Sequence, residues 1–295
     1  MNRRIDAYSL RLFAAAAQEG SIVRAAAREH IAPSALSRRL ADLEHAFGTP
    51  LLVRSPRGVV LTDAGQLVFG RGLQIDRELQ QLAREVQSLG GRVAGNVRVW
   101  ANMSAVVGFL PERLQALLAQ YPDVRVSLHE QDTPEVVRAC LDDRADIGLG
   151  VHTEVPQSIE RWHFASDPLL VVLPRGHALA RRRAVRFAEA MAYPLIGVRS
   201  GGSLDRFVHA QAFAAGQPLQ MAVSVSSFDA VCRMVEAGMG IAIIPHSAAA
   251  AYAGSRRFVR RPLDEPWAAR ELCIYAPRKT PRLRSVQAVI EAWRG

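Results

Sequence analysis

Apolar residues recur at helical spacing near the N-terminus of the chain. Four of them lie on one stripe of a helix that begins at Pro33, at intervals of four, three and four residues: Leu36, Leu40, Leu43 and Phe47. We expect this stripe to face a core. The opposite side carries small or polar side chains and one long cation: Ser34, Ser37, Arg38, Ala41 and His45. A face of this kind allows a partner to approach the helix closely.

A second short helix is predicted just upstream. Ser21 is a candidate N-cap for residues 22–29, and the alanines at 25–27 allow close packing of the following helix after a turn at residues 30–32. Two short helices joined by a tight turn are typical of a helix-turn-helix, whose second helix enters the DNA major groove. Downstream, two strand-like segments flank a turn with Arg57 at its tip, which predicts a hairpin or wing: residues 51–54 and 58–61.

Two more helices frame this motif. Residues 6–18 have an amphipathic pattern that ends near Gly20, and Thr62 can cap a long helix that reaches about Leu89. The large apolar residues of the long helix follow the heptad spacing of a coiled coil: Ile75, Leu79, Leu82, Val86 and Leu89. A single helix would leave this seam in water, so we expect it to hold a dimer. Packing on its own chain is the alternative.

Glycines at 90, 91 and 95 mark a linker, after which strands and helices alternate. The first set has predicted strands at 96–100, 124–128 and 146–150 and helices at 104–120 and 134–142. The second has strands at 169–173, 195–198, 221–225 and 241–244 and helices at 203–214 and 228–236. A tail strand at 271–275 and a helix at 283–293 are placed as returning across the domain. The pattern predicts two similar α/β lobes, the first with a largely parallel sheet.

Residues spread over the N-terminal motif resemble the signature of the LysR-type transcriptional regulators. The matching segments are Ala25-Ala26-Ala27, Ala35-Leu36-Ser37-Arg38, Leu43-Glu44, Phe47-Gly48, Pro50-Leu51-Leu52, Arg54, Leu61-Thr62 and Ala64-Gly65. Where the family usually has a glutamine in the recognition helix, this chain has Pro33. Proline is tolerated in the first helical turn but lacks an amide that could read a base edge.

The resemblance covers nearly the whole chain and implies its architecture. We expect an α/β protein with a mainly α, winged helix-turn-helix, a linker helix and a two-lobe effector domain similar to the periplasmic binding proteins. The implied boundaries are 1–62 for the DNA-binding domain, 63–92 for the dimerising helix and 93–295 for the effector domain. Within the latter, lobe I comprises 93–166 and 268–295, and lobe II comprises 167–267. Residues 235–245 match a structural hallmark of the second lobe.

Two sets of site residues follow. For DNA, we expect contacts from Pro33, Ser34, Ser37, Arg38 and the wing residue Arg57. For an effector, hydroxyl and amide side chains cluster at predicted strand ends, where open α/β sheets bind ligands: Asn102, Ser104, Thr133, Ser203 and Ser227. Each of these five is alternatively a plain helix cap. Because helix N-termini favour negative charge and Arg199 lies nearby, we expect a small anionic metabolite.

Composition narrows the class of protein. The 295 residues are 49% hydrophobic and 22% charged, as in a soluble globular chain with two or three domains. The net charge of +9 favours an anionic partner such as nucleic acid, although the surplus is spread along the chain and Lys279 is its one lysine. No apolar run has the length of a membrane span, and we expect a cytoplasmic protein. The three cysteines lie far apart among apolar residues and are expected to be buried free thiols.

Other chemistry finds little support in the sequence. The histidines and cysteines lack metal-ligand spacing, and the glycines at 238 and 240 follow a helix and precede a strand, the reverse of a dinucleotide fingerprint. We expect no enzyme activity, cofactor or metal, and the arginines at 181–183 stay unassigned. The expected function is an effector-modulated DNA-binding regulator, a homodimer or homotetramer with RNA polymerase as a candidate partner. Two alternatives remain: a two-lobe binding protein or enzyme without a DNA-reading role, and an architectural DNA-binding protein whose C-terminal domain binds nothing.

Overall fold

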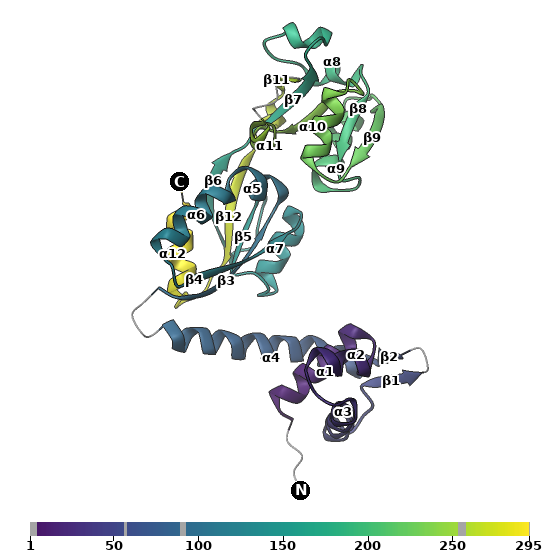
Figure 1. The fold of residues 1–295 in the computed structure, drawn as a ribbon, viewed down its shortest axis with the longest axis vertical. Helices are drawn as coiled ribbons and strands as arrows, with labels where there is room; N and C mark the ends of the chain where they lie inside the picture. Colours follow the sequence, from purple (N-terminus) through teal and green to yellow (C-terminus); the bar gives the residue numbers. More distant parts are fainter. Residues whose placement is uncertain (1–4, 56–57, 89–92, 253–257, 295) are drawn as a thin grey trace. The chain divides into compact units, whose positions relative to one another are not determined.

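The computed structural model describes residues 5–55, 58–88, 93–252 and 258–294, and the chain divides into two compact units, Met1–Gly90 and Gly91–Gly295 (Figure 1). The elements of the first unit are α1 (Ala7–Glu19), α2 (Ile22–Arg28), α3 (Pro33–Phe47), β1 (Leu52–Ser55), β2 (Gly58–Leu61) and α4 (Asp63–Ser88). This order confirms the predicted helix-turn-helix, hairpin and long helix.

The helix ends of the first unit follow from single residues. Asp6 caps α1 by accepting a hydrogen bond from the Ser9 backbone N–H at 2.8 Å, a bond that lowers the pKa of Asp6. Ser21 caps α2 through the backbone N–H of Arg24. Helix α3 begins with Pro33 and ends at Gly48, which has a left-handed φ of 70°. The chain can therefore turn sharply between the three helices.

The core of the first unit lies between α1 and α3. Leu36, Leu40 and Leu43 are buried against α1 and its Phe13, as the stripe predicted. Phe47 departs from that prediction because it is 38% exposed. It is the last residue of α3, where the helix runs past the buried cluster.

The wing is fixed to this core by hydrogen bonds. The Glu44 carboxylate accepts from the backbone N–H groups of Leu51 and Leu52 at 2.8 and 3.0 Å, so the end of α3 holds the entry to β1. Strands β1 and β2 pair antiparallel, and the N–H of Val59 donates to the Gly20 carbonyl. Thr62 caps α4 by accepting from the Gly65 N–H at 2.9 Å.

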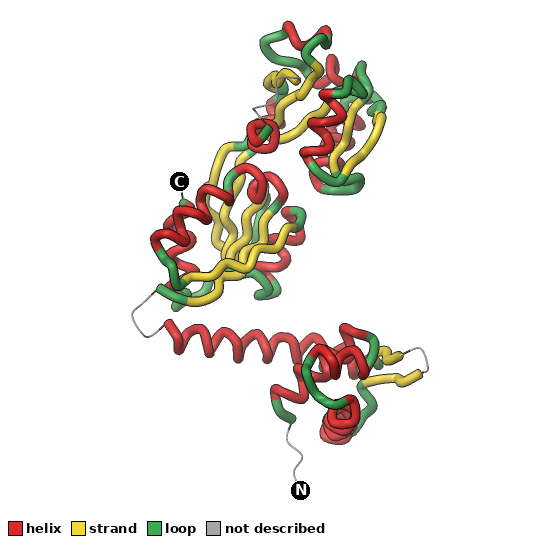
Figure 2. The backbone as a smooth tube through the Cα atoms, viewed as in Figure 1, coloured by secondary structure: helices red, strands yellow, loops and turns green. Residues whose placement is uncertain are grey.

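Lobe I of the second unit is a five-stranded sheet in the order β4-β3-β5-β12-β6, with helices on both faces (Figures 1 and 2). Its elements are β3 (Gly95–Ala101), α5 (Met103–Gly108), α6 (Leu110–Gln120), β4 (Val124–Glu130), α7 (Thr133–Leu141), β5 (Ile147–Val151), β6 (Ile159–Ser166), β12 (Glu271–Pro277) and α12 (Arg284–Trp293). Strands β4, β3 and β5 are parallel as predicted, but β12 pairs antiparallel with β5 and β6 because it returns from the second lobe. Strand β6 was not predicted.

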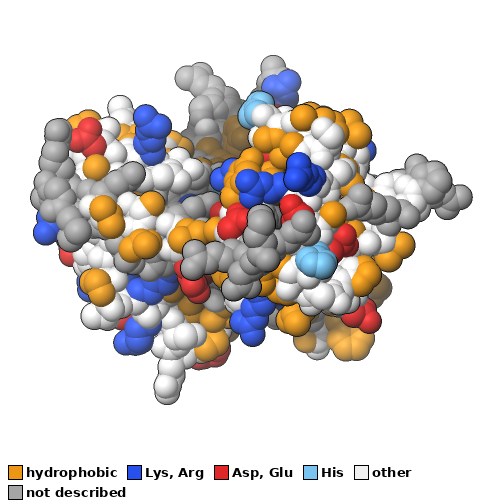
Figure 3. All heavy atoms as spheres, turned by 90° about the horizontal axis from the view of Figure 1, so that it is seen from below, with side chains coloured by type: hydrophobic (Ala, Val, Ile, Leu, Met, Phe, Trp, Pro, Cys, Tyr) orange, Lys and Arg blue, Asp and Glu red, His pale blue; other side chains and the backbone are white. Residues whose placement is uncertain are grey.

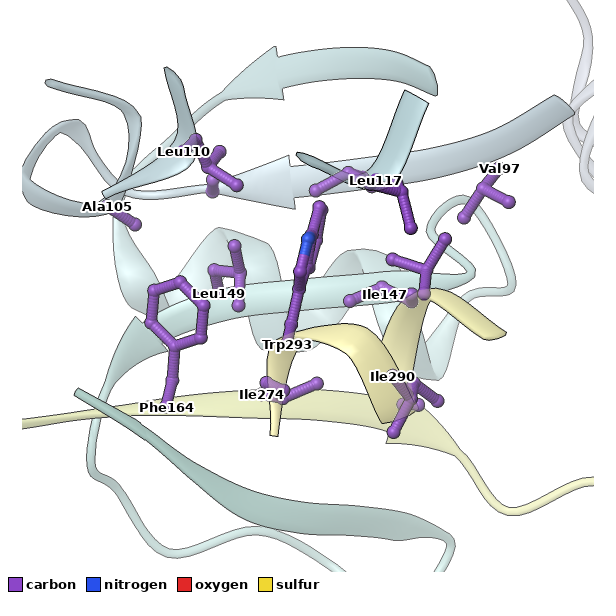
Figure 4. Packing of buried hydrophobic residues seen from close by; sticks show 14 of the residues in the cluster. Val97, Ala105, Leu110, Leu117, Ile147, Leu149, Phe164, Ile274, Ile290 and Trp293 are labelled. Carbon is purple, nitrogen blue, oxygen red and sulfur yellow. The ribbon is translucent and has the colours of Figure 1, made fainter. Parts of the chain in front are cut away.

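The core of lobe I is built around Trp293 of α12. Its ring lies among Leu117, Leu149, Ile274 and Phe164 (Figure 4). The opposite face of the sheet is covered by α7 through Val137 and Cys140. The predicted helix 104–120 is in fact two helices, α5 and α6, which meet at Phe109. Pro111 in the first turn of α6 lacks the N–H that a continuous helix would need, which explains the break.

Lobe II contains β7 (Leu169–Pro174), a 3₁₀ turn η1 (Ala178–Arg181), α8 (Phe187–Met191), β8 (Leu195–Val198), α9 (Ser203–Ala214), β9 (Met221–Val225), α10 (Phe228–Glu236), β10 (Ala242–Pro245), α11 (His246–Ala251), β11 (Phe258–Pro262) and a 3₁₀ turn η2 (Pro266–Ala268). Strand β7 pairs antiparallel with β10 and β11, whereas β8 and β9 are parallel. The prediction missed β11. The chain passes between the lobes twice, at residues 167–168 and again just before Glu271.

Candidate functional site

The polar face of α3 is open to solvent. Pro33, Ser34 and Arg38 are exposed and Ser37 is half-buried. Arg38 has no hydrogen-bond or ion-pair partner among the described residues, and its guanidinium is therefore available to an outside group. Arg57 lies outside the described residues.

Arg39, the next residue, has a structural role instead. Its guanidinium contacts the Asp6 carboxylate at 3.5 Å and the Ser9 hydroxyl at 3.3 Å, and it stacks over the Tyr8 ring at 5.1 Å. These contacts join α3 to the start of α1. The two neighbouring arginines thus differ: Arg39 joins two helices, whereas Arg38 is exposed.

Among the described residues of the first unit, the predicted seam of α4 is exposed. Ile75, Leu79, Leu82 and Val86 expose between 41% and 59% of their surface, and Leu89 lies outside the described residues. Four large apolar side chains in a row on one helix are a stripe that a partner helix would cover.

Two adjoining hollows lie between the lobes of the second unit. The smaller, about 60 Å³, is lined by Asn102, Met103, Ser104, Asp132, Thr133, Val151, Val198, Arg199, Gly202, Ser203, Leu204, Phe228 and Arg270. The larger, about 450 Å³, shares five of these residues and adds Pro134, Val137, His152, Thr153, Glu154 and Phe207. The volume of the larger one is in the range of small-molecule sites.

Four of the five predicted effector residues line the smaller hollow: Asn102, Ser104, Thr133 and Ser203. Ser227 is not part of its lining, although the next residue, Phe228, is. The hydrogen bonds separate caps from other roles. Asn102 caps α5 through the Ala105 N–H, and Ser227 caps α10 through the Ala230 N–H. The other three hydroxyls cap no helix in this way.

Those three residues connect the walls of the cavity. The Thr133 hydroxyl accepts from the Val151 N–H at 3.0 Å and joins α7 to the end of β5. The Ser104 hydroxyl accepts from Nη2 of Arg270 at 2.9 Å. The backbone N–H of Ser203, at the start of α9, donates to Oδ2 of Asp132 at 2.9 Å, a bond between the two lobes.

Arg270 lines the cavity but was not among the residues predicted from the sequence. It lies just before β12, lines both hollows, and donates from Nη2 to Oδ2 of Asp167 at 2.8 Å. The Asp167 side chain is fully buried, and its second oxygen accepts from the Ser247 N–H at 2.9 Å. Burial lowers the pKa of Arg270, and the Asp167 charge partly offsets this effect. Asp167 precedes a proline and Arg270 precedes a strand, and nothing in their spacing along the sequence indicates that the two side chains form a pair.

Acidic residues of lobe I also face the start of α9. Glu130 pairs with Arg199 at 2.7 Å, and Asp132 lies 3.9 Å from Arg206 in addition to its bond with Ser203. Arg199 has a left-handed φ of 49°, which turns the chain toward α9. The positive groups that the sequence offered for an anionic ligand, the α9 N-terminus and Arg199, are thus already paired with carboxylates of the chain itself.

On the face drawn in Figure 3, basic side chains are dispersed among acidic and apolar ones, consistent with a charge surplus spread along the chain. The described residues contain no cluster of His, Cys, Asp and Glu that could hold a metal ion. Within the same residues, no helix has the length and apolar character needed to cross a membrane.

A winged helix-turn-helix with an exposed polar recognition face, followed by a two-lobe domain with an interlobe cavity, defines a class: a DNA-binding regulator with a ligand-sensing domain. Comparison with known families gives the particular family. Residues 8–66 match the "Bacterial regulatory helix-turn-helix protein, lysR family", and residues 90–295 match the "LysR substrate binding domain". The chain belongs to the LysR family and is a DNA-binding transcriptional regulator with an effector-binding domain.

Relatives with assigned names are also transcriptional regulators. The uncharacterized HTH-type transcriptional regulator YnfL of Escherichia coli is 28% identical, over 93% of this chain and 93% of its own. The HTH-type transcriptional activator CmpR of Synechocystis is 27% identical, over 80% of this chain and 78% of its own. Among solved structures, full-length CbnR in complex with its target DNA is similar in fold, with a TM-score of 0.73 at 22% identity over 98% of this chain and 99% of that one.

Proposed function

We propose that the chain uses α3 and the wing to bind an operator and changes that binding when a small molecule enters the interlobe cavity. The cavity is the observation that carries the proposal, since it is formed by both lobes and is large enough for a ligand. In this proposal residues 1–62 read DNA, 63–92 dimerise and 93–295 sense the effector. A homodimer or homotetramer acts in the cytoplasm, with RNA polymerase as a further partner.

The DNA contacts are assigned to Pro33, Ser34, Ser37, Arg38 and Arg57. An exposed arginine on a recognition helix can bond two acceptors of a guanine edge, whereas a wing arginine typically meets phosphate. Pro33 offers no side-chain donor and contributes only contact surface. Arg38→Ala should weaken operator binding by about 1–3 kcal/mol. Arg57→Ala should lower the magnitude of the slope of log binding constant against log salt concentration by about one.

The measurement is a binding titration at several salt concentrations on genomic fragments selected by the purified protein. Arg39→Ala is the matched control, because Arg39 is bound to Asp6 and Ser9. That substitution should lower stability and leave base preference intact. Equal loss of sequence preference in Arg38→Ala and Arg39→Ala would remove Arg38 from the reading role.

Coupling between cavity and operator needs two lobe arrangements with different free energies. The ion pair of Glu130 and Arg199 bridges the lobes at the edge of the smaller hollow. A ligand that prefers one arrangement shifts the population toward it, and operator binding follows.

This coupling can be tested without knowing the effector. Glu130→Arg and Arg199→Glu each place like charges across the lobes, while the double variant restores an opposite pair. We expect each single variant to alter the operator footprint and the double variant to restore it. If all three variants leave the footprint unchanged, the lobe arrangement is not coupled to DNA.

A further inference from the structure

The larger hollow is lined by apolar side chains from both lobes and by several polar residues. Pro134 and Val137 of α7 form one wall, and Leu204 and Phe207 of α9 form the wall contributed by the other lobe. Each pair is spaced by three residues and so lies on one face of its helix. Phe207 is held in place by an edge-to-face contact with Trp267 at 5.6 Å. These walls suit a hydrophobic body the size of one aromatic ring.

The polar residues that line this hollow are Thr133, His152, Thr153, Glu154, Ser203 and Arg270, and the guanidinium of Arg270 carries positive charge. The Arg270 side chain is 11% exposed, and it lines both hollows. Nε and Nη2 donate to Asp167 and Ser104, while Nη1 has no acceptor among the described residues. A largely buried guanidinium N–H forms a stronger hydrogen bond to a carboxylate than to a neutral oxygen.

The alternative anion positions are less available. The Ser203 N–H at the start of α9 is occupied by Asp132, and Arg199 is occupied by Glu130. An incoming anion would have to displace a carboxylate of the chain at either place, whereas Nη1 of Arg270 needs no displacement. Burial also disfavours the Arg270 charge, and a second carboxylate would relieve this.

We propose that the effector is an amphiphilic carboxylate, with a hydrophobic body of about one ring between α7 and α9 and its carboxylate on Nη1 of Arg270. This inference rests on the proposed function, because it assigns a ligand class to the same cavity. The sequence favoured Arg199 and a helix N-terminus as the groups that bind the anion. In this proposal Arg270, beside the crossing between the lobes, binds the carboxylate instead.

The test uses calorimetric titration of the full-length protein with three probes: 3-phenylpropanoate, 3-phenylpropanamide and propanoate. The acid with a ring should bind, and both the amide and the acid without a ring should bind about tenfold more weakly or worse. Arg270→Gln should erase the preference for acid over amide, and Arg270→Lys should restore part of it. Phe207→Ala should erase the preference for the ring.

Phe213→Ala is the matched control, because Phe213 lies on the same helix, is 88% exposed and does not line the cavity. It should change neither preference. Equal affinity for acid and amide in the parent protein overturns the proposal even if the Arg270 variants fail to fold. The proposal is also overturned if Phe207→Ala and Phe213→Ala change the preference for the ring equally, or if none of the three probes binds. The footprint of the Glu130 and Arg199 variants needs no ligand, so it decides separately whether the proposed function stands.

Discussion

At the scale of single residues, burial decides which chemistry is available. Cys140, Cys232 and Cys273 are free and buried, as the sequence predicted. Desolvation raises the pKa of Cys140 to about 12 and that of Cys232 to about 11, and it also raises the pKa of Cys273. A raised pKa keeps each thiol protonated at neutral pH, and only the thiolate is strongly nucleophilic.

We therefore expect iodoacetamide at pH 7 to leave all three cysteines unmodified in the native protein and to alkylate them once the protein is unfolded in guanidinium. Mass spectrometry of the alkylated peptides measures this directly. Each thiol should have its own rate, set by opening of the part of lobe I or II that covers it. Rapid native alkylation of any one of them would mean that the cysteine is accessible and that its pKa is not raised.

Single residues also mark the limit of prediction from sequence. Caps and glycines act on their nearest neighbours along the chain, so Gly20, Ser21 and Thr62 could be assigned to helix ends in advance. Arg270 and Asp167 are 103 positions apart and meet only because two crossing segments lie side by side. The same holds for Asp132, which lies between β4 and α7 and accepts a hydrogen bond from the backbone of the other lobe.

At the scale of elements, periodicity predicted helices well and strand direction poorly. The spacing of Leu36, Leu40 and Leu43 fixes which side of α3 is buried, because a helix repeats every 3.6 residues. A strand shows the same alternation of side chains in parallel and antiparallel pairs. The alternation therefore could not predict that β7 pairs antiparallel with β10, or that β12 pairs antiparallel with β5. Buried and exposed positions alternate only partly in β6, so the segment lacks the regular pattern from which a strand is predicted.

At the scale of elements, we predict that the heptad seam of α4 holds a dimer. Burying a leucine is worth roughly 1.5–3 kcal/mol, and a partner helix would bury several. Leu79→Glu combined with Leu82→Glu should therefore yield monomers in sedimentation velocity. Gln66→Glu combined with Gln74→Glu is the control, since it adds the same charge to exposed positions of α4 outside the heptad seam. An intact dimer in the leucine variant would place the interface elsewhere.

At the scale of the whole molecule, the two units have separate hydrophobic cores. One cluster contains only residues of the first unit, including Phe13 and Leu36, and the clusters around Trp293 and in lobe II contain only residues of the second. Because cooperativity comes from shared packing, each unit should lose its structure with its own free energy.

The buried pair of Asp167 and Arg270 allows this independence to be tested. Asp167→Asn leaves the Arg270 charge without its buried partner, which typically costs about 3–5 kcal/mol. Hydrogen exchange followed by mass spectrometry should show faster exchange throughout β7, β12 and α12 in this variant, with α1 and α3 unchanged. Asp142→Asn, at an exposed ion pair with Arg144, should change neither unit by more than about 1 kcal/mol. Faster exchange in α1 and α3 of the Asp167 variant would show that the units unfold together, and the sensing domain would then act on the DNA-binding domain through its stability as well as through its lobes.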